Sequence, residues 1–123
     1  INESELCHEL RQRDGNVEEM AVTLQDIISS KYIAVTQGKS GAFLIKNNKN
    51  PERCPGFAAQ VIDKVGSGDA LLALLSVCLY SNFDEKLSLF IGSLAAAQSV
   101  ETIGNSVPVN KPKLLKIISH LLK

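Results

Sequence analysis

The sequence predicts an α/β protein in which a layered sheet packs against helices. Two short segments that resemble strands, at 31–36 and 42–45, come before two longer segments of helical character, at 70–80 and 84–100. Strands that precede packed helices are typical of a layered α/β architecture. The chain has 123 residues, of which 45% are hydrophobic, so it can bury a core without disulfides or a structural metal.

The N-terminal segment is predicted to form two helices. Leu6 and Leu10 lie four residues apart, which predicts a short helix that opens just after Asn2. A turn at 14–16 separates it from a second helix, because the apolar positions between 17 and 28 follow the helical period.

Two strands are predicted to follow. The segment KYIAVT at 31–36 is short and β-branched, which indicates a buried strand, and a glycine-bounded turn at 38–41 leads into a second strand at 42–45. The polar, proline-containing segment 47–55 predicts a surface loop, and 58–62 is a weaker strand candidate.

The second half of the chain is predicted to be helical. The segment 70–80 is apolar nearly all round, which indicates a buried helix. A second helix at 84–100 has Asp84 as its N-cap, and its small residues allow close packing on a neighbour. An amphipathic helix at 111–122 has Pro112 in its first turn.

Charge, hydropathy and cysteine spacing narrow the class of protein. Thirteen basic and thirteen acidic side chains give no electrostatic reason to expect nucleic acid or an anionic membrane as a partner. The apolar stretch at 70–80 is too short to span a bilayer, and no signal-peptide pattern opens the sequence, so we expect a cytoplasmic protein. Cys7, Cys54 and Cys78 have no CxxC spacing, which favours reduced thiols over disulfides or a zinc site.

The clearest chemical signal is the run DKVGSGD at 63–69, just before the apolar helix. Gly66 and Gly68 let backbone amides approach an anion, and a helix N-terminus carries partial positive charge, so a phosphate group is the natural ligand. Asp69, in the first helical turn, is placed to act as a base beside that anion hole. The alternative is that Ser67 or Asp69 only caps the helix.

The run at 63–69 resembles the D-T-x-G-A-G-D signature of the ribokinase (PfkB) family of carbohydrate kinases. Lys64 replaces the usual Thr and Ser67 the usual Ala, while both aspartates and both glycines are kept. Three further segments resemble family motifs and stand in the family's order: N-x-x-E at 2–5, T-x-G-x-x-G at 36–41, and a helix end and loop at 95–108. The resemblance implies a ribokinase-like fold, a Rossmann-like layered sheet with packed helices, of which this chain holds the C-terminal, nucleotide-binding portion.

The resemblance also implies a role for each matched residue. Asp69 would be the general base that takes the proton from the sugar hydroxyl, and the amides of Gly66, Ser67 and Gly68 would hold the charge of the transferring γ-phosphoryl group. Phosphoryl transfer needs mainly positioning, charge stabilisation and a base within reach, so these roles agree with the local chemistry. The residues that would line the ATP site are Thr36, Gly38, Gly41 and Asn2.

Two cations are implied in the same way. Asn2 and Glu5 would act on hydrated Mg²⁺ through water, because Mg²⁺ gives up its waters reluctantly. Asp63 resembles the family's cation-linked aspartate, which implies a monovalent cation such as K⁺. The loop at 101–106 is shorter than in ribokinase and argues against that site. Considered singly, each matched residue also fits a structural role at a strand end, a turn or a helix start.

Two functions remain open on the sequence. The first is ATP-dependent phosphotransfer to a hydroxyl of a sugar or sugar phosphate. The alternative is a non-catalytic nucleotide-binding or interaction module that retains the kinase fold, and intact Gly66, Gly68 and Asp69 favour the first. The family's sugar-contacting residues and lid come from an N-terminal half that has no counterpart here, and the first residue is Ile1. We therefore expect the isolated chain to be inactive, to expose apolar surface and to self-associate.

Overall fold

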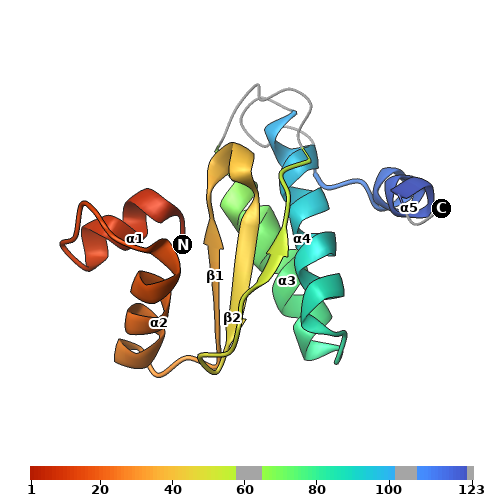
Figure 1. The fold of residues 1–123 in the computed structure, drawn as a ribbon. Helices are drawn as coiled ribbons and strands as arrows, with labels where there is room; N and C mark the ends of the chain where they lie inside the picture. Colours follow the sequence, from red (N-terminus) through yellow and green to blue (C-terminus); the bar gives the residue numbers. More distant parts are fainter. Residues whose placement is uncertain (58–64, 102–107, 122–123) are drawn as a thin grey trace.

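The computed structural model describes residues 1–57, 65–101 and 108–121. Their helices and strands form three layers. Two helices cover one face of a small sheet and two cover the other (Figure 1). The predicted layered α/β arrangement is therefore confirmed. The elements in chain order are α1 (Glu3–Glu9), α2 (Val17–Ile27), β1 (Tyr32–Thr36), the 3₁₀ turn η1 (Gly38–Ser40), β2 (Ala42–Lys46), β3 (Glu52–Cys54), α3 (Ser67–Tyr80), α4 (Glu85–Val100) and α5 (Lys111–Leu121).

The sheet has the order β1-β2-β3, and both described pairs of strands are antiparallel. Because successive side chains of a strand point to opposite faces, the sheet supplies two separate cores. The core toward α1 and α2 contains Leu6, Met20, Ala21, Leu24, Ile33, Val35, Phe43 and Ile45. The core toward α3 and α4 contains Ala42, Leu44, Cys54, Leu71, Leu75 and Leu89.

The predicted surface loop at 47–55 is wrong in part, because β3 lies within it. β3 is a short edge strand in which Cys54 is buried while Glu52 and Arg53 are exposed. The sequence of β3 shows no alternation of apolar and polar residues that would predict a strand. β3 is a strand because it pairs with β2. Arg53 also forms an ion pair with Glu18 of α2.

α3 packs against α4 through small residues, as the sequence predicted. A Cβ atom on Gly92 of α4 would lie 3.1 Å from the carbonyl oxygen of Leu71, so the two backbones approach closely. The prediction that α3 is a buried helix is wrong in part, because only Leu71, Leu75 and Cys78 are buried among its described residues. Only one side of α3 faces α4 and the sheet within the described part of the chain, and Leu72, Val77 and Tyr80 are exposed.

Polar side chains begin the helices where the sequence indicated. The Asp84 carboxylate accepts a hydrogen bond from the amide of Leu87 at 2.9 Å and caps α4, which confirms the predicted N-cap. The Asn110 side chain accepts a hydrogen bond from the amide of Lys113 at 2.9 Å at the start of α5.

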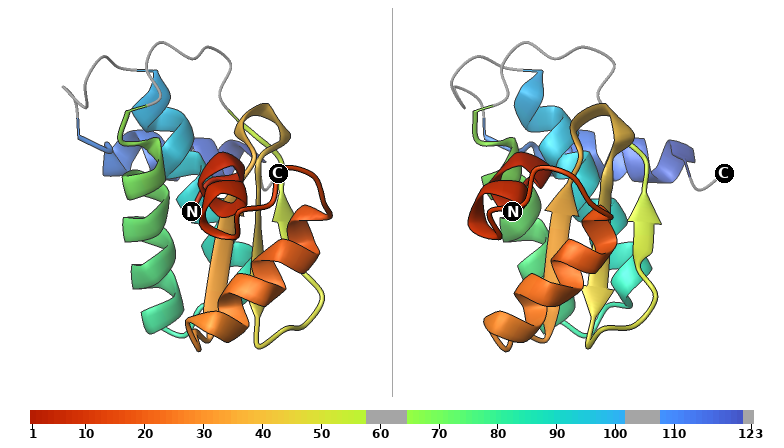
Figure 2. Two further views of the ribbon diagram at one scale, coloured as in Figure 1. Left: turned by 90° about the vertical axis from the view of Figure 1, so that its left-hand side faces the viewer. Right: turned by 60° about the vertical axis from the view of Figure 1, so that its left-hand side comes forward.

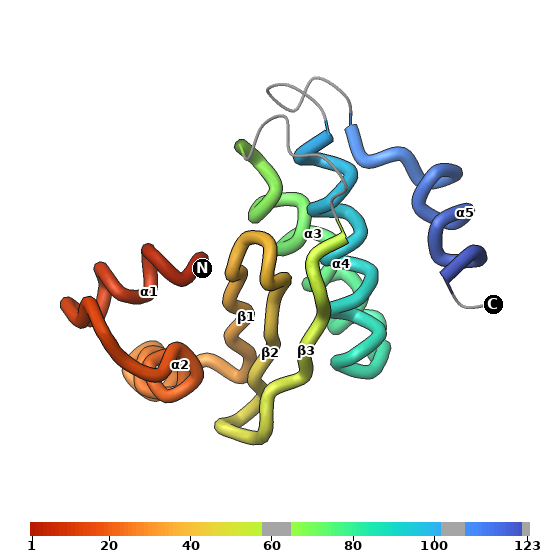
Figure 3. The backbone as a smooth tube through the Cα atoms, turned by 45° about the horizontal axis from the view of Figure 1, so that its top comes forward, coloured from red at the N-terminus to blue at the C-terminus, as the bar shows by residue number. Residues whose placement is uncertain are grey.

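α5 lies beyond α4 (Figure 3). The predicted strand candidate at 58–62 falls outside the described residues. None of the helices described is both long and apolar enough to cross a membrane.

We expect Leu89→Ala to destabilise the fold, because Leu89 is fully buried between α4, α3 and the sheet. A cavity at a buried leucine lowers the free energy of unfolding by about 2–5 kcal/mol. The matched control is Leu72→Ala on α3, where the side chain is 61% exposed and the cost is about 0.5 kcal/mol or less. Urea denaturation measures both, and equal losses would contradict the packing described.

Candidate functional site

The structure places the first two predicted motifs side by side. Asn2 forms a parallel β-bridge with Thr36, the last residue of β1. The Thr36 amide donates to the carbonyl oxygen of Ile1 at 3.0 Å. The Gln37 side chain donates to the Glu3 carboxylate at 3.1 Å. The segments 2–5 and 36–41 are thus held together, although thirty residues separate them.

Asn2 and Glu5 form a capping box at the start of α1. The Glu5 amide donates to Asn2 Oδ1 at 2.8 Å, and the Asn2 amide donates to Glu5 Oε2 at 2.9 Å. The structural role considered for these residues, as polar groups at a helix start, is therefore present. A carboxylate offers about four lone-pair sites, so the capping box leaves Glu5, which is exposed, with capacity for a hydrated cation.

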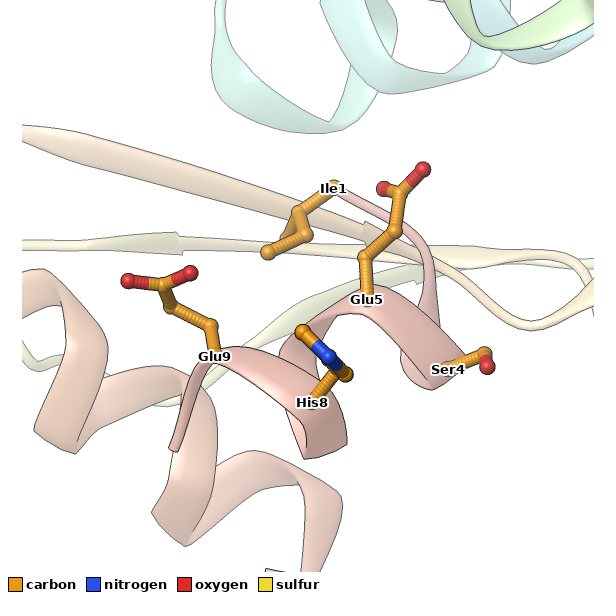
Figure 4. Close-up of a pocket in the computed structure, with 5 residues that line it drawn as sticks. All are labelled: Ile1, Ser4, Glu5, His8 and Glu9. Atoms are coloured by element: carbon orange, nitrogen blue, oxygen red, sulfur yellow. The ribbon is translucent and has the colours of Figure 1, made fainter. Parts of the chain in front are cut away.

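A shallow cavity of about 500 Å³ lies against α1 and is lined by Ile1, Ser4, Glu5, His8 and Glu9. Figure 4 shows that the carboxylates of Glu5 and Glu9 point in different directions. Among the residues that the structure describes, no group of three or more His, Cys, Asp or Glu side chains could hold a metal ion.

The turn between β1 and β2 is built from glycines that adopt positive φ. Gly38 has φ +56° and Gly41 has φ +92°, values that residues other than glycine rarely adopt. The Gln37 amide donates to the Gly41 carbonyl oxygen at 2.8 Å and the Gly41 amide to that of Gly38 at 3.1 Å. These two hydrogen bonds hold the backbone of the turn in place.

α3 begins with a glycine in the left-handed conformation. Gly66 is the N-cap, with φ +83° and ψ −5°, and among the described residues no side chain makes a capping hydrogen bond there. The alternative that Ser67 or Asp69 caps the helix is therefore wrong, because both residues lie inside the first turn. Asp69 and Gly68 are exposed. The first-turn amides of a helix have no intrahelical acceptors and carry partial positive charge, so this end attracts anions.

The glycine turn at 38–41 and the N-terminus of α3 lie at the same end of the molecule (Figures 1 and 2). This arrangement offers backbone amides to a phosphate group and one exposed carboxylate, Asp69, to a proton. Asp63, Lys64 and most of the loop at 101–106 fall outside the described residues. The contact of Gln37 with Glu3 joins residues distant in sequence, and no local pattern signals it.

The chain resembles known proteins both in sequence and in fold. Residues 1–112 match the sequence pattern of the family described as pfkB family carbohydrate kinase. Over 122 residues the chain is 29% identical to the bifunctional protein HldE of Bradyrhizobium sp. (strain ORS 278). The aligned region covers 97% of this chain and 25% of that protein.

Solved structures resemble the fold closely. Ribokinase of Arabidopsis thaliana, complexed with ribose and ATP, has a TM-score of 0.79 at 24% identity, over 95% of this chain and 39% of that chain. Phosphofructokinase-2 from Escherichia coli, in complex with potassium, has a TM-score of 0.82 at 18% identity, over 99% of this chain and 40% of that chain. These likenesses confirm the predicted ribokinase-like fold. The chain spans about a quarter of the curated relative's length and about two fifths of each solved chain.

The two glycines at the start of α3 are expected to respond oppositely to alanine. Gly66→Ala forces a side chain into the left-handed region and should lower the free energy of unfolding by about 1–2 kcal/mol. A Cβ atom on Gly68 would meet nothing within 4 Å. Gly68→Ala should therefore raise stability by up to about 1 kcal/mol through better helix propensity.

Thermal and urea unfolding of the two variants compare these effects directly. If Gly66→Ala were as stable as Gly68→Ala, the left-handed start of α3 would be contradicted.

Proposed function

Because this chain belongs to the pfkB family of carbohydrate kinases, we propose that it supplies the nucleotide-binding and phosphoryl-transfer part of an ATP-dependent kinase for a sugar or sugar phosphate. One observation carries the proposal. The N-terminus of α3, which begins at the left-handed Gly66 and has exposed Asp69 in its first turn, lies at the same end of the molecule as the glycine turn at 38–41.

In this proposal α3 provides the reaction centre. A sugar hydroxyl oxygen attacks the γ-phosphorus of ATP, and the bond from that phosphorus to the bridging oxygen breaks to release ADP. Asp69 accepts the proton of the attacking hydroxyl. The amides of Gly66, Ser67 and Gly68 stabilise the negative charge on the transferring group, in a backbone conformation that is set before the nucleotide arrives.

The nucleotide lies along the turn beside β1. Thr36, Gly38, Gly41 and Asn2 line the ATP site, and the bridge between Asn2 and Thr36 keeps these residues adjacent. A glycine turn suits this position because its backbone lets a ligand approach without a side chain between them. The Arabidopsis ribokinase, which is described as complexed with ribose and ATP, supports this choice of nucleotide.

Cations complete the proposed site. Asn2 and Glu5 act on hydrated Mg²⁺ through water, and Mg²⁺ supplies charge neutralisation for the phosphates when it is bound. The spare lone pairs of the exposed Glu5 carboxylate fit that role. Asp63 is the candidate for a monovalent cation. The E. coli phosphofructokinase-2 is described in complex with potassium, whereas the short loop at 101–106 argues against such a site here.

The chain should bind adenine nucleotide. We expect calorimetric titration with Mg·ADP to give a dissociation constant in the millimolar range or tighter, and EDTA should weaken the binding because Mg²⁺ then no longer screens the phosphates. Absence of heat at millimolar nucleotide would contradict the proposed site.

Asp69→Asn separates catalysis from structure in the full-length kinase. Asn has nearly the shape of Asp but cannot accept the proton, so kcat should fall by roughly 10²–10⁴-fold while nucleotide affinity changes little. Asp14→Asn, at an exposed position between α1 and α2, is the matched control and should leave kcat within a few fold. A near-normal kcat for Asp69→Asn would overturn the assignment of Asp69 as the base.

A further inference from the structure

The segment 54–57, which follows β3, lies directly against the glycine turn at 38–41. A Cβ atom on Gly41 would overlap the carbonyl oxygen of Cys54 and lie 2.6 Å from the carbonyl carbon of Pro55. In the opposite direction, a Cβ atom on Gly56 would lie 2.9 Å from the carbonyl oxygen of Lys39 and 3.5 Å from that of Gly38. Two backbones therefore touch, with a glycine on each side and no side chain between them.

The other side of segment 54–57 is anchored on the helices. Cys54 is 5% exposed and belongs to the core that contains Leu71 and Leu75 of α3. The ring of Phe57 packs edge-on against Phe90 of α4, with 5.5 Å between ring centroids. Segment 54–57 thus links the glycine turn to both helices that cover this face of the sheet.

We propose that Gly56 is a positioning residue that sets where the glycine turn lies relative to the N-terminus of α3. The inference rests on the proposed function, in which the turn lines the ATP site and α3 holds the γ-phosphoryl group. A nucleotide that contacts both parts spans a fixed length, so a displacement of the turn weakens its binding.

The requirement for glycine at position 56 is one of space. Among the described glycines, those with positive φ are Gly38, Gly41 and Gly66. Gly56 is not one of them, so alanine fits its backbone torsions. A Cβ atom 2.9 Å from the Lys39 oxygen is closer than side chains tolerate, and the atom it meets is backbone. The added methyl group therefore has to push the turn away from segment 54–57.

The test compares Gly56→Ala and Gly56→Val with Gly15→Ala in the full-length protein. The Gly15 control adds the same methyl group, but its nearest neighbour is the flexible end of the Met20 side chain at 3.4 Å. We expect Gly56→Ala to weaken Mg·ADP binding several-fold and Gly56→Val about tenfold or more in calorimetry, while Gly15→Ala binds as the wild type does.

Hydrogen exchange supplies a readout that a loss of stability alone would not give. The amides of Ser40 and Gly41 donate to the carbonyl oxygens of Gln37 and Gly38, each at 3.1 Å. In folded Gly56 variants these two amides should exchange faster, while amides of α2 exchange at the wild-type rate.

The outcomes separate a failure of the proposed function from a failure of the role inferred for Gly56. A wild-type protein that binds no Mg·ADP contradicts the proposed function and this inference with it. If wild type and Gly15→Ala bind Mg·ADP and Gly56→Ala binds equally well with unchanged exchange at 38–41, only the role of Gly56 is overturned. Should Gly56→Val fail to fold, Gly56→Ala decides alone.

Discussion

The burial of β2 on both faces is the constraint on which the rest of the structure depends. Phe43 and Ile45 face α1 and α2, while Ala42 and Leu44 face α3 and α4. Because all four side chains are at most 6% exposed, neither helical layer can leave the sheet without exposing a core. The two layers are therefore fixed to one strand, and everything at its N-terminal end is placed with them.

The glycine turn at 38–41 leads directly into the N-terminal end of β2. The candidate site at this end consists mainly of backbone groups. Gly41 and Gly66 both adopt positive φ, so torsions that most residues avoid occur at the two places where the proposed ATP contacts lie. Backbone amides held by a rigid scaffold need no rearrangement when charge develops, which is how such sites stabilise a transferring phosphoryl group. In the proposed reaction only Asp69 contributes side-chain chemistry at α3.

Local signals in the sequence were sufficient where structure is local. The helical period, the Asp84 cap and the turn at 38–41 were predicted correctly because neighbouring residues determine them. β3 was missed because its pairing with β2 determines it. The exposed side of α3 was not predicted because an apolar composition does not say which faces find neighbours. The contact of Gly56 with Lys39 involves residues distant in sequence, and no pattern around either residue signals it.

A crystal structure of the full-length protein with Mg²⁺ and a non-hydrolysable ATP analogue tests the proposed site most directly. The γ-phosphate oxygens should lie about 3 Å from backbone amides of residues 66–68, with the Asp69 carboxylate facing the γ-phosphorus. The nucleotide should run along the turn at 38–41. A nucleotide bound elsewhere, or a γ-phosphate that makes no contact with the start of α3, would contradict the proposal.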